Sequence, residues 1–142
     1  KGLTVRATGR ISTVVTTPGT LNLMLRFGSI DVWDSGAMTL NVAAKANVPW
    51  ILDLEVFARA IGSGTTADLI GVGSFLSEAV LASVAPTAGG ELTHVLPYNT
   101  APAVGSGFDS TAAQLLDFMA KWSVLNASNS IRLETFSVDM WS

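Results

Sequence analysis

The sequence predicts an all-β fold, namely an antiparallel β-sandwich and most simply a jelly roll of about eight strands. Two observations carry this prediction. Short runs of alternating apolar and polar residues recur along the chain, and clusters of Gly, Ser, Thr and Pro separate them at intervals of about 8–12 residues, as is typical of all-β proteins. The runs show no internal repeat and leave no room for the crossover helices that parallel strands require, so the strands should pair antiparallel.

Length and composition support one domain that assembles with other molecules. The chain has 142 residues, which suffices for a single core but not for two domains of ordinary size. Only 13% of the residues are charged, against about 25% in a typical soluble domain. Because monomers rarely expose large uncharged surfaces, much of this surface should be covered in an assembly.

The same composition excludes several classes of function. Eight Lys and Arg against eleven Asp and Glu give a net charge of −3 without a basic cluster, which excludes a protein that binds nucleic acid by neutralising phosphates. The chain has no cysteine and therefore no disulfide, thiolate metal site or cysteine nucleophile. No apolar stretch reaches the ~18 residues of a membrane-spanning helix, so we expect no membrane partner.

Four strands are expected before residue 45, because turn residues interrupt the alternation three times. Pro18 and Gly19 suit the central positions of a type II turn and should join the first two strands as a hairpin. Gly28 with Ser29, and then the segment from Asp34 to Gly36, supply the other two breaks. The four expected strands are residues 3–15, 21–27, 30–33 and 38–42.

Two later segments fit both a helix and a strand. In residues 49–61 the apolar residues lie at helical spacing and also on every second position, and Pro49 would suit the first turn of a helix. Residues 112–124 show the same conflict. Because two long helices would interrupt the turn-rich rhythm on either side, we expect strands in both segments.

The remaining segments are also interpreted as strands and loops. Residues 67–77 should form a bulged or closely packed strand, because two glycines lie within it. Residues 87–90 should be a loop and residues 97–110 a long surface connection. Residues 130–140 should form a final strand with a β-bulge, because its apolar residues change from odd to even positions partway along.

Few residues are candidates for catalysis. His94 is the sole histidine, the Gly-x-Ser-x-Gly motif is absent, and we expect His94 at the surface or an interface near a strand end. Asp31 and Asp34 flank Trp33, as an acid pair beside a sugar-stacking ring would, but Asp34 opens a turn and the turn role is favoured. Zinc and calcium need several ligands close together, which the sequence does not offer. We therefore predict no enzyme, no cofactor and no metal site.

The four tryptophans are more informative than the polar residues. Trp50 and Trp122 lie within alternating apolar runs and should belong to the core. Trp33 stands beside two aspartates and Trp141 next to the last residue, so both are expected at a rim. An exposed tryptophan there serves as a protein interface or stacks on a ligand such as a sugar, and we favour the interface.

Several short strings in turns and strand edges, taken together, resemble those of a group of tailed-bacteriophage and prophage structural proteins with a C-terminal β-sandwich. The resemblance covers residues 9–140, implies strands in both ambiguous segments, and carries no active-site motif. It also implies that residues 1–142, a single β-sandwich domain, form the C-terminal part of a longer chain. The strings are Gly9-Arg10-Ile11-Ser12-Thr13, Leu25-Arg26-Phe27-Gly28, Ser35-Gly36-Ala37-Met38, Asn47-Val48-Pro49-Trp50, Phe108-Asp109-Ser110-Thr111-Ala112-Ala113-Gln114 and Ser128-Asn129-Ser130-Ile131.

The resemblance and the low charge together lead to one expected function and one alternative. We expect a virion structural protein, a capsid decoration or head-fibre unit that assembles as a homotrimer and packs on other virion proteins such as the major capsid protein. The alternative is the receptor-binding head of a tail fibre, which would recognise a host surface glycan through Trp33 or residues 97–110. A glycan-degrading enzyme that uses aspartates ranks third.

Overall fold

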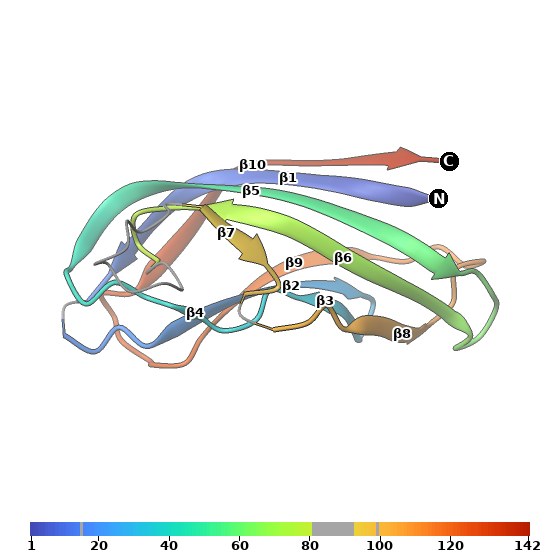
Figure 1. Cartoon of the computed structure of the whole chain (residues 1–142), viewed down its shortest axis with the longest axis horizontal. Helices are drawn as coiled ribbons and strands as arrows, with labels where there is room; N and C mark the ends of the chain where they lie inside the picture. The colour runs from blue at the N-terminus through green and yellow to red at the C-terminus, as the bar shows by residue number, and fades with distance from the viewer. Residues whose placement is uncertain (15, 81–92, 99) are drawn as a thin grey trace.

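A computed structural model describes residues 1–14, 16–80, 93–98 and 100–142 and confirms the all-β sandwich. Two antiparallel sheets pack face to face (Figure 1). The described residues contain no helix, and hence none that could cross a membrane. The strands are β1 (Gly2–Thr13), β2 (Thr20–Phe27), β3 (Ile30–Asp34), β4 (Met38–Thr39), β5 (Lys45–Ala60), β6 (Ala67–Leu76), β7 (Thr93–Leu96), β8 (Val104–Phe108), β9 (Leu116–Trp122) and β10 (Ser130–Trp141).

The larger sheet has the strand order β10-β1-β5-β6-β7, and β8 pairs with the opposite end of β6. In the smaller sheet, β2 lies between β9 on one side and β3 and β4 on the other. Early strands thus pair with late ones, β1 with β10 and β2 with β9, and the two chain ends lie side by side (Figure 1). This nesting is compatible with a jelly roll, whose complete connectivity stays a prediction.

The core lies between the two sheets and follows the period-two alternation of the strands. In the larger sheet, Val5, Leu52 and Leu54 point inward from the paired strands β1 and β5. Leu21 and Leu23 of β2 face them from the smaller sheet and are also fully buried. Each buried side chain of this size contributes about 1.5–3 kcal/mol of transfer free energy, so these rows hold the two sheets together.

Both segments that fitted a helix as well as a strand are strands. Residues 49–61 lie almost entirely within β5, and residues 112–124 contain β9. Along β5, Trp50 and Leu52 face the core whereas Ile51 and Asp53 face outward. A helix would have left one broad face of this segment without a partner, whereas the strand gives each face its own neighbours.

Pro49 lies inside β5 although proline cannot donate a ladder hydrogen bond. The pairing of β5 with β6 begins only at Ile51, so the strand is unpaired on that side at Pro49. Just before it, Asn47 has a φ of 53°, and the β1–β5 register shifts by one residue between Ile11 and Thr13. A bulge therefore precedes the proline and ends the regular part of the strand.

The final strand contains the expected β-bulge. The pairs with β1 are Thr8 with Thr135 and Gly9 with Leu133, which leaves Glu134 as the extra residue. Because of the bulge, the apolar residues before Glu134 and those after it all lie on the inner side of the sheet. The change of alternation in the sequence therefore predicted a real feature of the backbone.

The expected hairpin between the first two strands is wrong. Gly19 does adopt the positive φ, 79°, that the turn prediction required. However, β1 pairs with β5 and β10, and β2 pairs with strands of the other sheet. The chain after β1 therefore crosses from one sheet to the other, because a turn motif restricts the local backbone but does not choose a strand's partner.

The expected long connection over residues 97–110 is wrong in part, because it contains β8. Gly105 of β8 lies so close to the backbone of Val32 in β3 that a Cβ atom would collide with the carbonyl group. Phe108 of the same strand is buried. Gly105, which was one of the residues that indicated a loop, instead allows close packing between the sheets. The loop expected at residues 87–90 lies outside the described residues.

Candidate functional site

Trp33 does not lie at a rim, contrary to the prediction. Its side chain is only 4% exposed, and its Nε1 donates a hydrogen bond to the carbonyl oxygen of Gly71 at 3.2 Å. The cause is a bulge, because Leu25 pairs with Trp33 whereas Arg26 pairs with Asp31, and Val32 is the extra residue. Val32 and Trp33 both point inward as a result, so Trp33 offers no surface for a partner or a ligand.

The two aspartates beside Trp33 are held by local contacts. Asp31 accepts a hydrogen bond from Nε of Arg26 at 2.7 Å, and this bond holds the pKa of the Asp31 carboxyl below its ordinary value. Asp34 accepts hydrogen bonds from the Asn22 side chain and the backbone N–H of Gly36. The hydrogen bond from Gly36 thus stabilises the expected turn, which begins at Asp34. With Trp33 buried, the pair lacks the stacking ring that a sugar-cleaving site would need.

His94 is buried within the chain, which corrects the prediction that it lies at the surface. It pairs with Phe75 across β6 and β7 on the inner side of the sheet, and its ring meets that of Tyr98 edge-on at 5.4 Å. Residues 93–98 form too short a run, and one that ends on Pro97, to reveal this inward register from sequence alone. Within the described ranges, no three or more His, Asp or Glu side chains lie close enough together to hold a metal ion.

Trp141 lies on the outer face of the larger sheet and is 43% exposed, in keeping with its expected rim position. Its ring meets Phe57 edge-on at 5.5 Å. It also covers Gly2, where a Cβ atom would come within 2.9 Å of the indole. A glycine at the start of β1 therefore lets the indole lie against the sheet. Its role as an interface or stacking residue stays a prediction.

Trp141 belongs to a wider apolar surface, which we call the outer face. Strand register places Val72 and Val95 between two rows of apolar residues, one through Ile51 and Leu76 and one through Phe57 and Ile70. Between them lie polar residues such as Arg6 and Asp53, whose side chains are 3.1 Å apart. The apolar members of the outer face are Ile51, Phe57, Ile70, Val72, Leu76, Val95, Val104 and Trp141.

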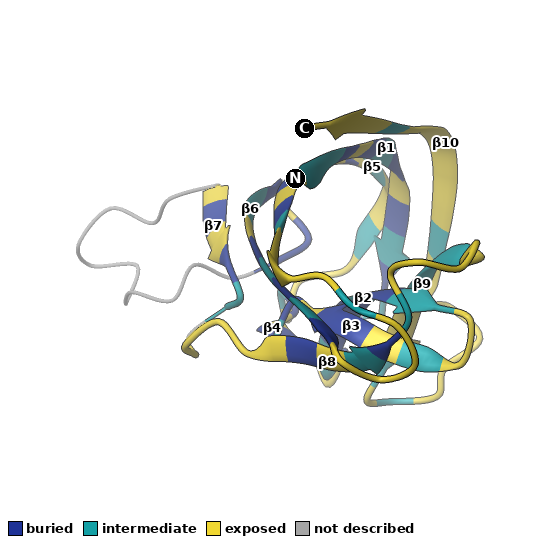
Figure 2. Ribbon diagram, turned by 90° about the vertical axis from the view of Figure 1, so that its right-hand side faces the viewer, coloured by how far each residue is buried: buried dark blue, intermediate teal, exposed yellow. Residues whose placement is uncertain are grey.

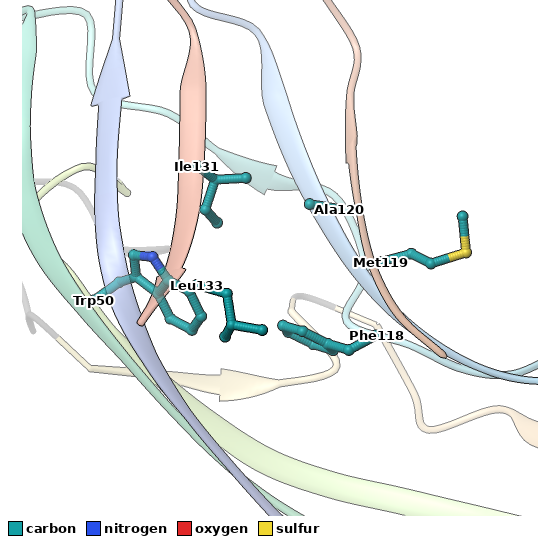
Figure 3. Close-up of a pocket in the computed structure, with 6 residues that line it drawn as sticks. All are labelled: Trp50, Phe118, Met119, Ala120, Ile131 and Leu133. Atoms are coloured by element: carbon teal, nitrogen blue, oxygen red, sulfur yellow. The ribbon is translucent and has the colours of Figure 1, made fainter. Parts of the chain in front are cut away.

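A second feature is an apolar cleft between β9 and β10, the strands that end the two sheets on one side of the sandwich. Figure 2 shows β10 exposed or half-buried along its length. The cleft has a volume of about 190 Å³. In Figure 3 the Met119 side chain points away from the space that the other five side chains surround. The lining residues are Trp50, Phe118, Met119, Ala120, Ile131 and Leu133.

Aromatic rings form the floor and one wall of this cleft. Trp50 stacks on buried Phe75 at 5.9 Å and lies 6.4 Å from Phe118 across the sandwich. Phe118 in turn stacks on Phe136 of β10 at 5.7 Å. The four rings lead from the centre of the core to the surface, so the cleft opens directly onto aromatic faces.

Trp50 supplies the one strongly polar side-chain group of the cleft. The indole is 1% exposed, and its Nε1 has no hydrogen-bond partner among the described residues. Gly9 makes this position possible, because a Cβ atom there would lie 2.8 Å from two atoms of the indole. None of the six lining residues carries a charge. The cleft therefore combines mostly apolar walls with an unsatisfied indole donor that lies buried behind them.

Comparisons with models of protein families, with curated proteins and with solved structures found no match to this chain.

Proposed function

We propose that this chain is a structural unit of a tailed-bacteriophage particle that acts by packing against copies of itself and against other virion proteins such as the major capsid protein. The resemblance of its turn and strand-edge strings to those of phage structural proteins supports the assignment of the chain to a phage particle. The outer face of the larger sheet supports the packing, and it is the observation that carries the proposal. No step of this function requires catalysis, a cofactor or a metal.

The outer face is unusual for a sheet face that no other described part of the chain covers. An antiparallel sheet that faces water on one side normally alternates apolar residues inward with polar residues outward. Here the outward positions include eight apolar residues, and Val95 is 76% exposed. Exposed apolar patches larger than a few hundred Å² mark interaction surfaces. Burial of this face would add about 25 cal/mol for every Å² of apolar surface removed from water.

A closed homotrimer is the assembly that we propose. Closed symmetry covers the same patch on every copy without leaving one patch free to continue into a filament. Few ion pairs should cross the interface, because some charged groups of the outer face already pair within one chain, as Arg6 does with Asp53. Assembly would then stabilise each folded copy by mass action.

The alternative is a tail-fibre head that binds a host surface glycan. Since Trp33 is buried, this function depends on residues 97–110 or on Trp141, whose exposed ring lies at the end of the outer face. Stacking on a sugar needs one open aromatic face with polar groups beside it, and Asp139 and Thr4 pair in the adjacent row. A glycan array that the unchanged chain binds and Trp141→Ala does not bind would favour this alternative.

Light scattering on the purified chain tests the assembly. We expect a mass of three times 14.8 kDa at micromolar concentration, and a single-chain mass for Val72→Asp, because a carboxylate in the middle of the outer face would be buried without a partner. Leu125→Asp is the matched control, because Leu125 is fully exposed away from this face. A monomer in the unchanged chain contradicts self-assembly.

The location on the particle is tested separately by quantitative mass spectrometry of purified virions. Hundreds of copies per particle would support capsid decoration, and a few to a few tens would support a fibre or tail position. Absence from the particle would contradict the structural role altogether.

A further inference from the structure

We propose that the cleft between β9 and β10 binds a small, neutral ring compound that carries one hydrogen-bond acceptor, and that the Nε1–H of Trp50 is its donor. The cleft lies between the sheets and shares no residue with the outer face. The inference therefore goes beyond the structural function and does not depend on it.

The size of the cleft sets the size of the ligand. Its volume of about 190 Å³ is close to that of engineered apolar cavities of about 150 Å³ that bind benzene. The space exists because Ala120 projects from β9 toward the larger sheet at a position where its neighbours Phe118 and Trp122 have large rings. One six-membered ring with a short substituent fits, whereas an extended peptide or a sugar chain does not.

The walls select an uncharged and mostly apolar molecule. Phe118, Ile131 and Leu133 present only carbon atoms, and the Trp50 ring supplies an aromatic face. A carboxylate or ammonium group would lose its hydration without meeting an opposite charge, because no lining residue is charged. A ring, by contrast, gains both burial and offset stacking.

The unsatisfied indole nitrogen selects one acceptor on that ring. A buried donor without a partner costs about 1–3 kcal/mol, so a group that accepts its hydrogen bond is favoured. A carbonyl oxygen on an otherwise apolar molecule satisfies the donor and leaves no further polar atom unpaired.

The route to the donor passes Ile131. Figure 3 shows the nitrogen-bearing edge of the indole on the side of the cleft where Ile131 lies. Ile131 is half-buried on β10, a strand with no described partner on its outer side. The acceptor would thus reach Nε1 as the Ile131 side chain turns outward, and the ring would then occupy the space beside Ala120.

The test compares two ligands of nearly the same shape, acetophenone and α-methylstyrene, in which a C=CH₂ group replaces the C=O group. The four indole N–H signals of the protein are followed by NMR during titration of each compound. We expect acetophenone to move the Trp50 N–H signal downfield in a saturable way, because the ketone oxygen accepts its hydrogen bond. α-Methylstyrene, which has no acceptor, should not cause this downfield shift. The Trp50 signal is assigned with Trp50→Phe or, if that variant fails to fold, from its contacts with the Ile131 methyl groups.

Two variants of the same strand locate the binding. Ala120→Leu fills the cleft and should weaken acetophenone binding at least tenfold, which corresponds to about 1.4 kcal/mol. Lys121→Leu changes an exposed residue of the same strand that does not line the cleft, and this variant should bind as the unchanged chain does. Equal binding by Ala120→Leu, or saturable binding that leaves the Trp50 signal in place, overturns the proposal, as does no binding of acetophenone.

The same titration on Val72→Asp separates this proposal from the structural one. Ligand binding that persists in this variant shows that the cleft works in each chain whatever its oligomeric state. Loss of binding there, together with loss of assembly, would instead assign the cleft to the subunit interface and overturn the proposal of a ligand site.

Discussion

At the residue scale, the tryptophans show how the same side chain takes different roles. Trp50 is fully buried as predicted, Trp122 is only half-buried, and Trp33 is buried although a rim position was expected. The difference for Trp33 is one inserted residue, Val32, which turns the next side chain inward. The difference for Trp122 is its place near the end of an edge strand.

Trp50→Ala and Trp122→Ala should therefore differ in cost. Removing the buried Trp50 ring should lower the free energy of unfolding by about 3–5 kcal/mol, whereas the half-buried Trp122 should cost roughly half as much. Urea unfolding of both variants measures the difference. Equal losses would mean that Trp122 is as well packed as Trp50.

Gly9 should be the least tolerant glycine of β1. A Cβ atom there would lie 2.8 Å from the Trp50 ring and would also collide with the carbonyl oxygen of Arg132. Gly9→Ala should therefore lower the free energy of unfolding by about 1–3 kcal/mol. Thr8→Ala on the exposed side of the same strand is the control and should cost less than about 1 kcal/mol. If Gly9→Ala left the free energy of unfolding unchanged, β10 would have to be able to move away from the added methyl group.

At the element scale, hydrogen bonds of one turn tie two distant loops together. The Asp109 carboxylate accepts hydrogen bonds from the backbone and hydroxyl of Thr111 and from the backbone N–H of Gly64. Ser110 and Gly62 exchange further hydrogen bonds beside them. The segment that follows β8 is thereby fastened to the β5–β6 connection, which places β8 against both β6 and β3.

This turn should make stability depend on pH. The hydroxyl of Thr111, followed by the N–H of Gly64, lowers the pKa of the Asp109 carboxyl below its ordinary value. A carboxyl whose pKa is lower in the folded state stabilises it above the unfolded pKa, and this contribution is lost as the pH falls through the folded pKa. The melting temperature of the unchanged chain should thus fall on acidification below about pH 4.

Asp109→Asn should show a smaller fall over the same range, because the titrating group is gone. Thermal unfolding at about pH 6 and about pH 2.5 measures both chains. Asp139→Asn, on the exposed face of β10 and outside this turn, serves as the control and should fall as the unchanged chain does. An Asp109→Asn variant with the full acid sensitivity would assign that sensitivity to other carboxyls, such as Asp31 and Glu134, whose pKa values are also lowered by arginine partners.

At the scale of the whole molecule, the apolar residues divide between three places. One set fills the core between the sheets, one lines the cleft, and one lies on the outer face of the larger sheet. The first set accounts for folding of a single chain. The third lies on a sheet face that the described residues leave uncovered, which agrees with the low charge of the chain and with its proposed assembly.

Assembly through the outer face should make the melting temperature depend on concentration. Because association stabilises only the folded chain, a hundredfold rise in protein concentration should raise the melting temperature by roughly 3–8 °C. Val72→Asp should melt at one temperature over the same range, and Leu125→Asp should behave as the unchanged chain. A melting temperature of the unchanged chain that does not depend on concentration would contradict self-association.

The alternation of apolar and polar residues was enough to predict most strands. Strand and turn signals are local, because side chains alternate at every residue and glycine or proline restricts its own backbone. For this reason the four early strands and the bulge of β10 were predictable, whereas the two ambiguous segments also needed the turn-rich rhythm on either side of them. Strand β8 was not predictable, since a segment with two glycines has the composition of a loop, and Gly105 gains its packing role only from its contact with Val32.

The sequence by itself thus determined the all-β class, the main strand positions and the low charge that points to assembly. Only the tertiary structure decided which strands pair, that Trp33 and His94 face inward, and that Trp50 leaves a free donor at a cleft between β9 and β10. The physical reason is the separation along the sequence over which each interaction acts. Alternation is set by neighbouring residues, whereas a one-residue bulge or a pairing between strands over a hundred residues apart depends on what the rest of the chain packs against it.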